Sequence, residues 1–199
     1  MKAGRDNVPI DAVRQEVSDT DVAVYRAIAG TPTPTLDRTL RRLSSSADRS
    51  MLWLSLAVVI GQRRGRPRRA ALMGVASIGV ASATVNLGAK QLHRRARPDR
   101  VAAAVPRQRQ VPMPRSTSFP SGHAASAFAF AGAVGAELPL LSLPLHLLAT
   151  TVAYSRVHTG VHYPIDVLTG AAIGTAAAAA VPTLLGAGGV VKQRLEQRR

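Results

Sequence analysis

The sequence predicts an all-α protein, a polytopic membrane bundle of about five transmembrane helices that follows an amphipathic helical N-terminal segment. Two observations carry this prediction: long runs without a charge, and a strongly basic remainder. Four runs that lack Asp, Glu, Lys and Arg are 18 to 25 residues long, and they lie at 70–89, 116–136, 138–155 and 167–191. A helix needs about 20 apolar residues to cross a bilayer. A soluble all-α protein with alanine-rich core helices is the alternative.

The composition narrows the function classes. The chain has 199 residues, 26 Lys and Arg against 11 Asp and Glu, a formal net charge of +15 and a hydrophobic content of 46%. That apolar content argues against disorder. Without cysteine the chain has no disulfides, thiolate zinc sites or cysteine nucleophiles. Aromatic residues make up only 4%, which argues against a stacking surface for single-stranded nucleic acid, so no nucleic-acid partner is predicted.

The first 48 residues read as a peripheral lead-in to the membrane domain. Two short amphipathic helices are predicted at 19–29 and 36–43, divided by the prolines of the TPTPT segment. Residues 1–18 carry no predicted helix and are candidates for disorder. We therefore expect an N-terminal segment at 1–48, a membrane-embedded domain at 49–191 and a basic tail at 192–199.

The first of the five spans is the shortest. The apolar run at 51–61 has 11 residues, so it crosses a bilayer only if its helix begins within 44–50. That start would bring Asp48 and Arg49 to the membrane interface.

Basic residues follow the second span in the pattern KxxxxxxRP. Lys90 and Arg97 are seven residues apart, two helical turns, and share a face if the helix continues to Pro98. Two cations on one face suit an anion such as phosphate, and arginine binds such oxygens bidentately. The alternative is that basic residues at a span end anchor it at the interface, which is how we interpret His93, Arg94 and Arg95.

The motif PSGH opens the third span at residues 120–123. Gly122 permits a tight turn, and Ser121 can cap the helix that follows. The N–H groups at a helix N-terminus bind anions, and His123 enters that helix in its first turn. An ordinary turn with an incidental histidine is the alternative.

The motif SRxxxxxHxxxD joins the last two spans and contains Ser155, Arg156, His162 and Asp166. The last two are four residues apart and share a face on a helix, which Pro164 predicts to begin near His162. Asp166 can then orient the imidazole and leave its other nitrogen free to attack. A pair that merely stabilises a helix end is the alternative.

The three motifs lie at span ends, and the alternating direction of the spans puts all of them on one side of the membrane. The predicted site is rich in cations and holds one carboxylate, which disfavours a divalent metal, so no metal is predicted. His146 is interpreted as a packing residue of an apolar span, and His158 as a residue that could line the site.

Together the motifs resemble the signature of the type 2 phosphatidic acid phosphatase superfamily, which includes lipid phosphate phosphatases, vanadium haloperoxidases and bacterial acid phosphatases. Eleven residues match, within 90–166. The resemblance implies that His162 attacks phosphorus and forms a phosphohistidine, that Asp166 orients it and that His123 protonates the leaving oxygen. It also implies that the phosphoryl oxygens are held by Lys90, Arg97, Ser121, the Gly122 amide and Arg156.

The resemblance further implies a metal-independent phosphatase of the plasma membrane that needs no cofactor and acts on a lipid phosphate. Candidate substrates are a polyprenyl diphosphate, a polyprenyl-phosphoryl sugar phosphate, phosphatidate and phosphatidylglycerophosphate. A vanadate-dependent haloperoxidase and a non-enzymatic basic membrane scaffold are the alternatives. The oligomeric state is not predicted. With five spans, 17 Lys and Arg lie on the site face and 9 on the other, which favours a cytoplasmic site, whereas bacterial relatives usually face outward.

Overall fold

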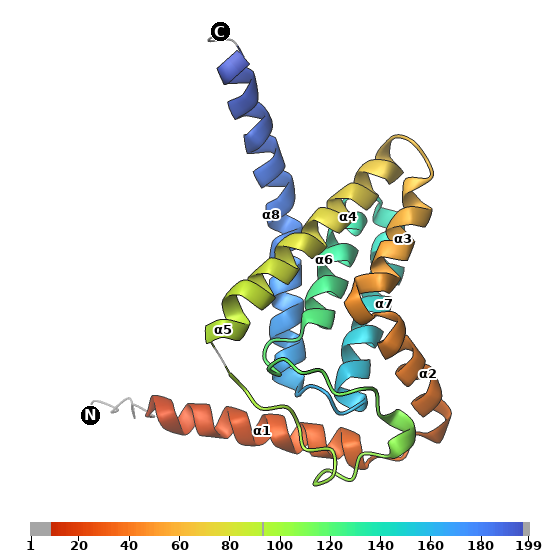
Figure 1. Ribbon diagram of the computed structural model, residues 1–199, viewed down its shortest axis with the longest axis vertical. Helices are drawn as coiled ribbons and strands as arrows, with labels where there is room; N and C mark the ends of the chain where they lie inside the picture. The colour runs from red at the N-terminus through yellow and green to blue at the C-terminus, as the bar shows by residue number, and fades with distance from the viewer. Residues whose placement is uncertain (1–8, 93, 197–199) are drawn as a thin grey trace, which may run out of the picture.

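The computed structural model describes residues 9–92 and 94–196, and within these ranges every regular element is a helix. Helices α3, α4, α6, α7 and α8 form a bundle, and α1 lies across one end of it (Figure 1). The elements in chain order are α1 (Ile10–Gly30), α2 (Pro34–Ser46), η1 (Asp48–Ser50), α3 (Met51–Gly61), α4 (Arg66–Ala83), the π-helical η2 (Thr84–Ala89), α5 (Lys90–Leu92), η3 (Arg107–Arg109), α6 (Gly122–Glu137), α7 (Pro139–His158) and α8 (Pro164–Glu196).

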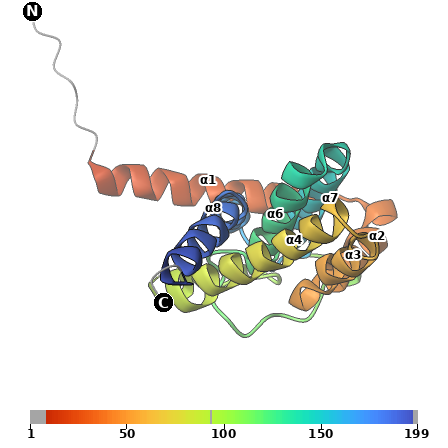
Figure 2. The same cartoon turned by 90° about the horizontal axis from the view of Figure 1, so that it is seen from above.

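Helix α6 is the centre of the bundle, and the view from above places it among α4, α7 and α8 (Figure 2). Its sequence is mostly alanine and glycine, so neighbouring backbones approach it closely. A Cβ at Gly170 or Gly174 of α8 would overlap the carbonyl oxygens of Ser121 and Ala125. The small residues therefore set the distance between α6 and α8.

Two helical stretches are long and apolar enough to cross a membrane, Arg66–Leu92 and Pro164–Leu185. The uncharged run at 116–136 becomes helix only from Gly122, which leaves α6 with 16 residues. Helix α3 keeps its 11 residues, because Arg49 and Ser50 before it have left-handed φ angles of 52° and 61° and interrupt the backbone. The predicted helical bundle is thus present, while its five membrane spans stay a prediction.

The N-terminal helix is longer than the sequence pattern indicates. It begins at Ile10, nine residues before the predicted start, so the expectation of disorder is wrong for residues 10–18. Local side-chain bonds one turn apart, such as Gln15 Nε2 to Asp19 Oδ1 at 3.0 Å, support this first part. Residues 1–8 lie outside the described part of the chain, as do 197–199 of the predicted basic tail.

Buried charges hold α1 and α2 against the end of the bundle. Arg109 of η3 is 1% exposed and donates to Asp37 Oδ1 at 2.8 Å and to the Thr31 carbonyl at 2.6 Å. His158 Nε2, at the end of α7, lies 3.3 Å from the same carboxylate and 2.9 Å from Thr33 Oγ1. We call α1, α2 and the segment 94–121 the polar layer, since it closes the end of the bundle at which the three motifs meet.

Candidate active site

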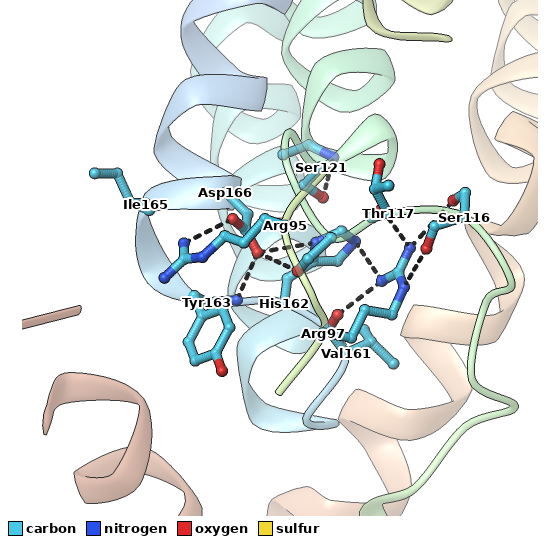
Figure 3. A network of polar contacts seen from close by, with 12 residues as sticks. Arg95, Arg97, Ser116, Thr117, Ser121, Val161, His162, Tyr163, Ile165 and Asp166 are labelled. Atoms are coloured by element: carbon cyan, nitrogen blue, oxygen red, sulfur yellow. Dashed lines mark hydrogen bonds and ion pairs between the residues drawn. The ribbon is translucent and has the colours of Figure 1, made fainter. Parts of the chain in front are cut away.

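The three motifs converge where the polar layer meets the end of the bundle. Helix α5 ends at this end of the molecule, α6 begins there, and the turn from α7 to α8 lies at the same end (Figure 1). Figure 3 shows the contacts that connect the segments, with His162 between Asp166 and Arg97.

His162 lies in the turn before α8 and is 2% exposed. Its Nδ1 is 3.5 Å from Asp166 Oδ2, and its Nε2 is 3.3 Å from Arg97 Nη1. A guanidinium only donates, so this contact requires Nε2 to accept and puts the ring proton on Nδ1, toward Asp166. Burial, aided by the nearby Arg97 and Arg156, lowers the pKa of His162 to about 4. The imidazole is therefore neutral at neutral pH, with its lone pair at Nε2.

The helix start that Pro164 predicted near His162 is confirmed, but His162 and Asp166 do not share a helix face. Helix α8 begins at Pro164, so His162 precedes it in a turn. Proline suits the first helical position because its ring fixes φ and it lacks the N–H that would be unpaired there. The two side chains still meet because the backbone N–H of Tyr163 donates to Asp166 Oδ2 at 2.9 Å and closes the turn.

Asp166 is completely buried, and both oxygens of its carboxylate accept hydrogen bonds. Ser118 Oγ donates to its Oδ2, and Arg95 Nη1 donates to its Oδ1 at 3.0 Å. Its backbone carbonyl accepts from the Ser121 N–H at 2.8 Å. The carboxylate that faces His162 is thus fixed by Arg95 and Ser118 of the segment 94–121, as second partners fix the orienting carboxylate of a nucleophile.

Arg97 is held by carbonyl oxygens rather than by a helix. It donates to the carbonyls of Ser116, Thr117 and Val161 at 2.8, 3.1 and 2.7 Å. The expected shared helix face with Lys90 is wrong, because the helix ends at Leu92 and a residue before proline disfavours the α conformation. Both cations nevertheless meet at Ser116, whose Oγ accepts from Lys90 Nζ at 3.2 Å and from Arg97 Nη2 at 3.3 Å.

The PSGH motif forms the predicted capped helix start. Ser121 Oγ accepts from the Ala124 N–H at 3.5 Å, which confirms the cap. Gly122 and His123 line a cavity of about 200 Å³ whose polar lining also includes Arg49, Ser50, Ser82, Asn86, Lys90 and Ser126. His123 and Lys90 of the first motif therefore share one chamber, whose lining includes neither Arg97 nor His162.

Arg156 does not line this chamber and is 1% exposed. Its Nη1 donates to Ser44 Oγ at 2.6 Å and lies 3.8 Å from Asp48 Oδ1. Asp48 Oδ1 is in turn 2.8 Å from His123 Nε2. A carboxylate from η1 thus joins two residues of the predicted site.

The prediction that Arg95 anchors the span at the membrane interface is wrong, because its side chain belongs to the site. Its guanidinium bridges Asp166 Oδ1 at 3.0 Å and Asp21 Oδ2 at 2.7 Å, and its Cζ lies 4.1 Å from the centroid of the Tyr163 ring. Asp21 also accepts from the Ile165 N–H at 2.8 Å, which ties α1 to α8. Arg94 is exposed, as an anchor would be, and His93 lies outside the described residues.

The other two histidines lie apart from this network. His146 Nδ1 is 2.8 Å from the Ser142 carbonyl of its own helix, and its ring packs against Phe128. His158 contacts Asp37 and Thr33 and does not line the chamber. Among the described residues no three His, Asp or Glu side chains gather as a metal site, and the absence of a metal stays a prediction.

A neutral imidazole backed by a carboxylate, next to fixed cations and a helix N-terminus, can transfer a phosphoryl group. Phosphoryl transfer spreads negative charge over three oxygens, and such donors stabilise that charge. Fold and site together define a membrane enzyme of phosphoryl transfer.

The comparisons with known proteins give the family. The PAP2 superfamily model matches residues 70–187, and the chain belongs to that superfamily. The decaprenylphosphoryl-5-phosphoribose phosphatase of Mycobacterium tuberculosis is 37% identical over 181 residues, which cover 89% of this chain and 93% of that protein. The protein of the same name from Mycolicibacterium smegmatis is 35% identical over 154 residues, covering 75% and 78%.

Solved structures agree with the fold. The PAP2 type phosphatidylglycerolphosphate phosphatase of Bacillus subtilis superposes with a TM-score of 0.67 at 25% identity, covering 85% of this chain and 86% of that one. LpxE of Aquifex aeolicus superposes with a TM-score of 0.69 at 24% identity, covering 81% and 94%, and supports the fold alone. The chain is a membrane lipid phosphate phosphatase of the PAP2 type.

Proposed function

We propose that this phosphatase hydrolyses the phosphomonoester of a polyprenyl-phosphoryl sugar phosphate, of the kind named by decaprenylphosphoryl-5-phosphoribose. The observation that carries this is the similarity to the mycobacterial phosphatases, which extends over 89% of the chain and so includes more than the catalytic motifs. The substrate offers a phosphate to the chamber at the bundle end while its polyprenyl chain stays in the bilayer.

In the first half of the proposed reaction, the Nε2 lone pair of His162 attacks phosphorus. The bond between phosphorus and the sugar oxygen breaks as His123 gives that oxygen a proton, and a phosphohistidine forms. Asp166 accepts the Nδ1 hydrogen bond and stabilises the positive charge that develops on the ring. The present 3.5 Å separation is long, as such contacts often are before substrate binds.

In the second half, a water molecule gives one proton to the now neutral His123 and its oxygen attacks phosphorus. The bond between phosphorus and Nε2 breaks, phosphate leaves and His162 regains its lone pair. The phosphoryl oxygens are held throughout by Lys90, Arg97, Arg156 and the N–H of Gly122, while Ser121 maintains the helix start that presents this N–H. The side chains supply the whole reaction, without a cofactor or metal.

We further propose that the domain at 49–191 crosses the plasma membrane several times, with five helices in all. The segment 1–48 lies along the interface on the site side, and the basic tail at 192–199 lies on the other. Support comes from the position of α1 across the bundle end (Figure 1) and from its exposed apolar side chains, among them Val13, Val17 and Val24.

The experiment is phosphate release by the purified protein in detergent with EDTA, from decaprenylphosphoryl-5-phosphoribose, phosphatidate and phosphatidylglycerophosphate. The proposal expects the highest kcat/KM with the first lipid, and activity that is indifferent to EDTA. His162→Ala should abolish release, whereas the matched control His146→Ala should retain it. A preference for either glycerolipid would contradict the proposed substrate, and full activity of His162→Ala would contradict the mechanism.

A further inference from the structure

The contact between Asp48 and His123 is the feature that the three motifs leave unexplained. Asp48 Oδ1 lies 2.8 Å from His123 Nε2, although 75 residues separate them in the chain. Asp48 belongs to η1, outside the matched region 70–187. A carboxylate here repels the phosphate that the surrounding cations attract, so its presence requires a reason.

The backbone of η1 and the residue after Asp48 hold this carboxylate against α6. Arg49 and Ser50 directly after it adopt left-handed φ angles of 52° and 61°, which are uncommon for residues other than glycine. Ser50 Oγ donates to Ser126 Oγ at 3.0 Å, and Ser126 lies one turn after His123 on α6. The segment η1 is thus fastened twice to the helix that carries the histidine, once by Ser50 and once by Asp48 itself.

The charges around His123 explain why a carboxylate lies here: it offsets the cations that disfavour a protonated imidazole. Arg156 from α7 and Lys90 from α5 are the cations that face the imidazole, and Arg49 lines the same cavity. Burial and the two cations Arg156 and Lys90 favour the neutral ring, and among the described groups that act on His123, Asp48 is the only negative one. An opposite charge in contact favours the protonated form of an imidazole. The hydrogen bond to His123 likewise lowers the pKa of Asp48, which keeps it ionised.

We infer that Asp48 is a positioning residue that holds His123 as a proton donor, by accepting the Nε2 hydrogen bond and leaving Nδ1 for the leaving oxygen. The inference rests on the proposed function, in which His123 protonates the sugar oxygen as the bond to phosphorus breaks. The proton moves from Nδ1 to that oxygen and returns to Nδ1 from water in the second half. Asp48 keeps its charge and its Nε2 hydrogen bond throughout.

The test compares leaving groups that differ in their need for a proton. Asp48→Asn should lower kcat about 10- to 100-fold with decaprenylphosphoryl-5-phosphoribose, whose sugar alkoxide is a poor leaving group. With 4-nitrophenyl phosphate, whose leaving group departs without a proton, the loss should stay below about 3-fold. In the variant the alkaline limb of kcat with the lipid should move to lower pH, and Asp48→Glu should restore much of both properties.

Controls separate this inference from its premises. Asp19→Asn removes an equally negative but exposed side chain and should leave both activities unchanged. His123→Ala should show the same leaving-group difference, more strongly, and its absence there would contradict the proposed mechanism itself. If His123→Ala shows the difference but Asp48→Asn matches the wild type, loses both activities equally or becomes faster, the role assigned to Asp48 is wrong. A faster variant would mark Asp48 as a plug of the phosphate site.

Discussion

The bundle and the polar layer are held together by different interactions. In the bundle, α6 and α8 approach through Gly170 and Gly174, so side-chain volume decides whether the helices fit. In the polar layer, long charged side chains join distant segments, as Arg95 does with Asp21 and Asp166, and Arg109 with Asp37. The helices therefore provide a frame, whereas ion pairs between distant segments fix the geometry of the site.

The largest effect is expected from Arg97→Lys. An ammonium cannot reproduce the planar set of bonds that Arg97 makes to three carbonyls and to His162 Nε2. We expect kcat/KM for phosphate release to fall about 100- to 1,000-fold, the loss found when a fixed transition-state donor is removed. Arg94→Lys, the same change at an exposed position, should have little effect. Equal activities of the two variants would contradict a role of Arg97 in the site.

Arg95→Ala tests whether the polar layer organises the catalytic carboxylate. It leaves Asp21 and Asp166 without their common partner, and breaking a buried ion pair in this way costs about 3–5 kcal/mol. Denaturation in detergent should show a large loss of stability, and kcat should fall about 10-fold because Asp166 is no longer fixed. Asp21→Asn in the Arg95→Ala background should then cost less than Asp21→Asn alone. Additive effects would show that the bridge does not couple α1 to the site.

The smallest effect on activity is expected from a substitution within the bundle. Gly174→Ala places a Cβ against the backbone of Ala125 and should lower the free energy of unfolding by about 1–3 kcal/mol. Gly79→Ala is the matched control on α4, where a Cβ meets nothing within 4 Å, and it should be neutral or slightly stabilising. Both variants should keep their kcat, since neither touches the polar layer. A reduced kcat in a folded Gly174→Ala protein would mean that bundle and site are not separable in this way.

The helices of the bundle were predictable because the sequence patterns that mark them are local. Uncharged runs mark the helices, and the three motifs place His123, His162 and Asp166 at helix ends that meet. Local geometry was predicted less well. The spacing of Lys90 and Arg97 predicted a shared helix face, but Pro98 favours an extended backbone at Arg97 and the helix ends earlier.

Most of the supporting residues were not predictable, for a physical reason. Asp21, Asp48, Arg95 and Ser118 reach the site through contacts with partners 48 to 75 residues away, or, for Asp21 and the Ile165 N–H, 144 residues away. No periodicity or spacing within a segment encodes such a contact. The one signal in the sequence was an ionisable residue near a span end, and interfacial anchoring explains that equally well.

Trapping the phosphohistidine shows whether His162 forms a covalent bond to phosphorus. Purified protein is mixed with substrate labelled in the terminal phosphate, quenched in base after milliseconds and digested, and the labelled peptide is sequenced. We expect an acid-labile, base-stable label on His162, absent from His162→Ala and present in His146→Ala. Label on another residue, or rapid turnover with no labelled protein and inverted configuration at phosphorus, would contradict it.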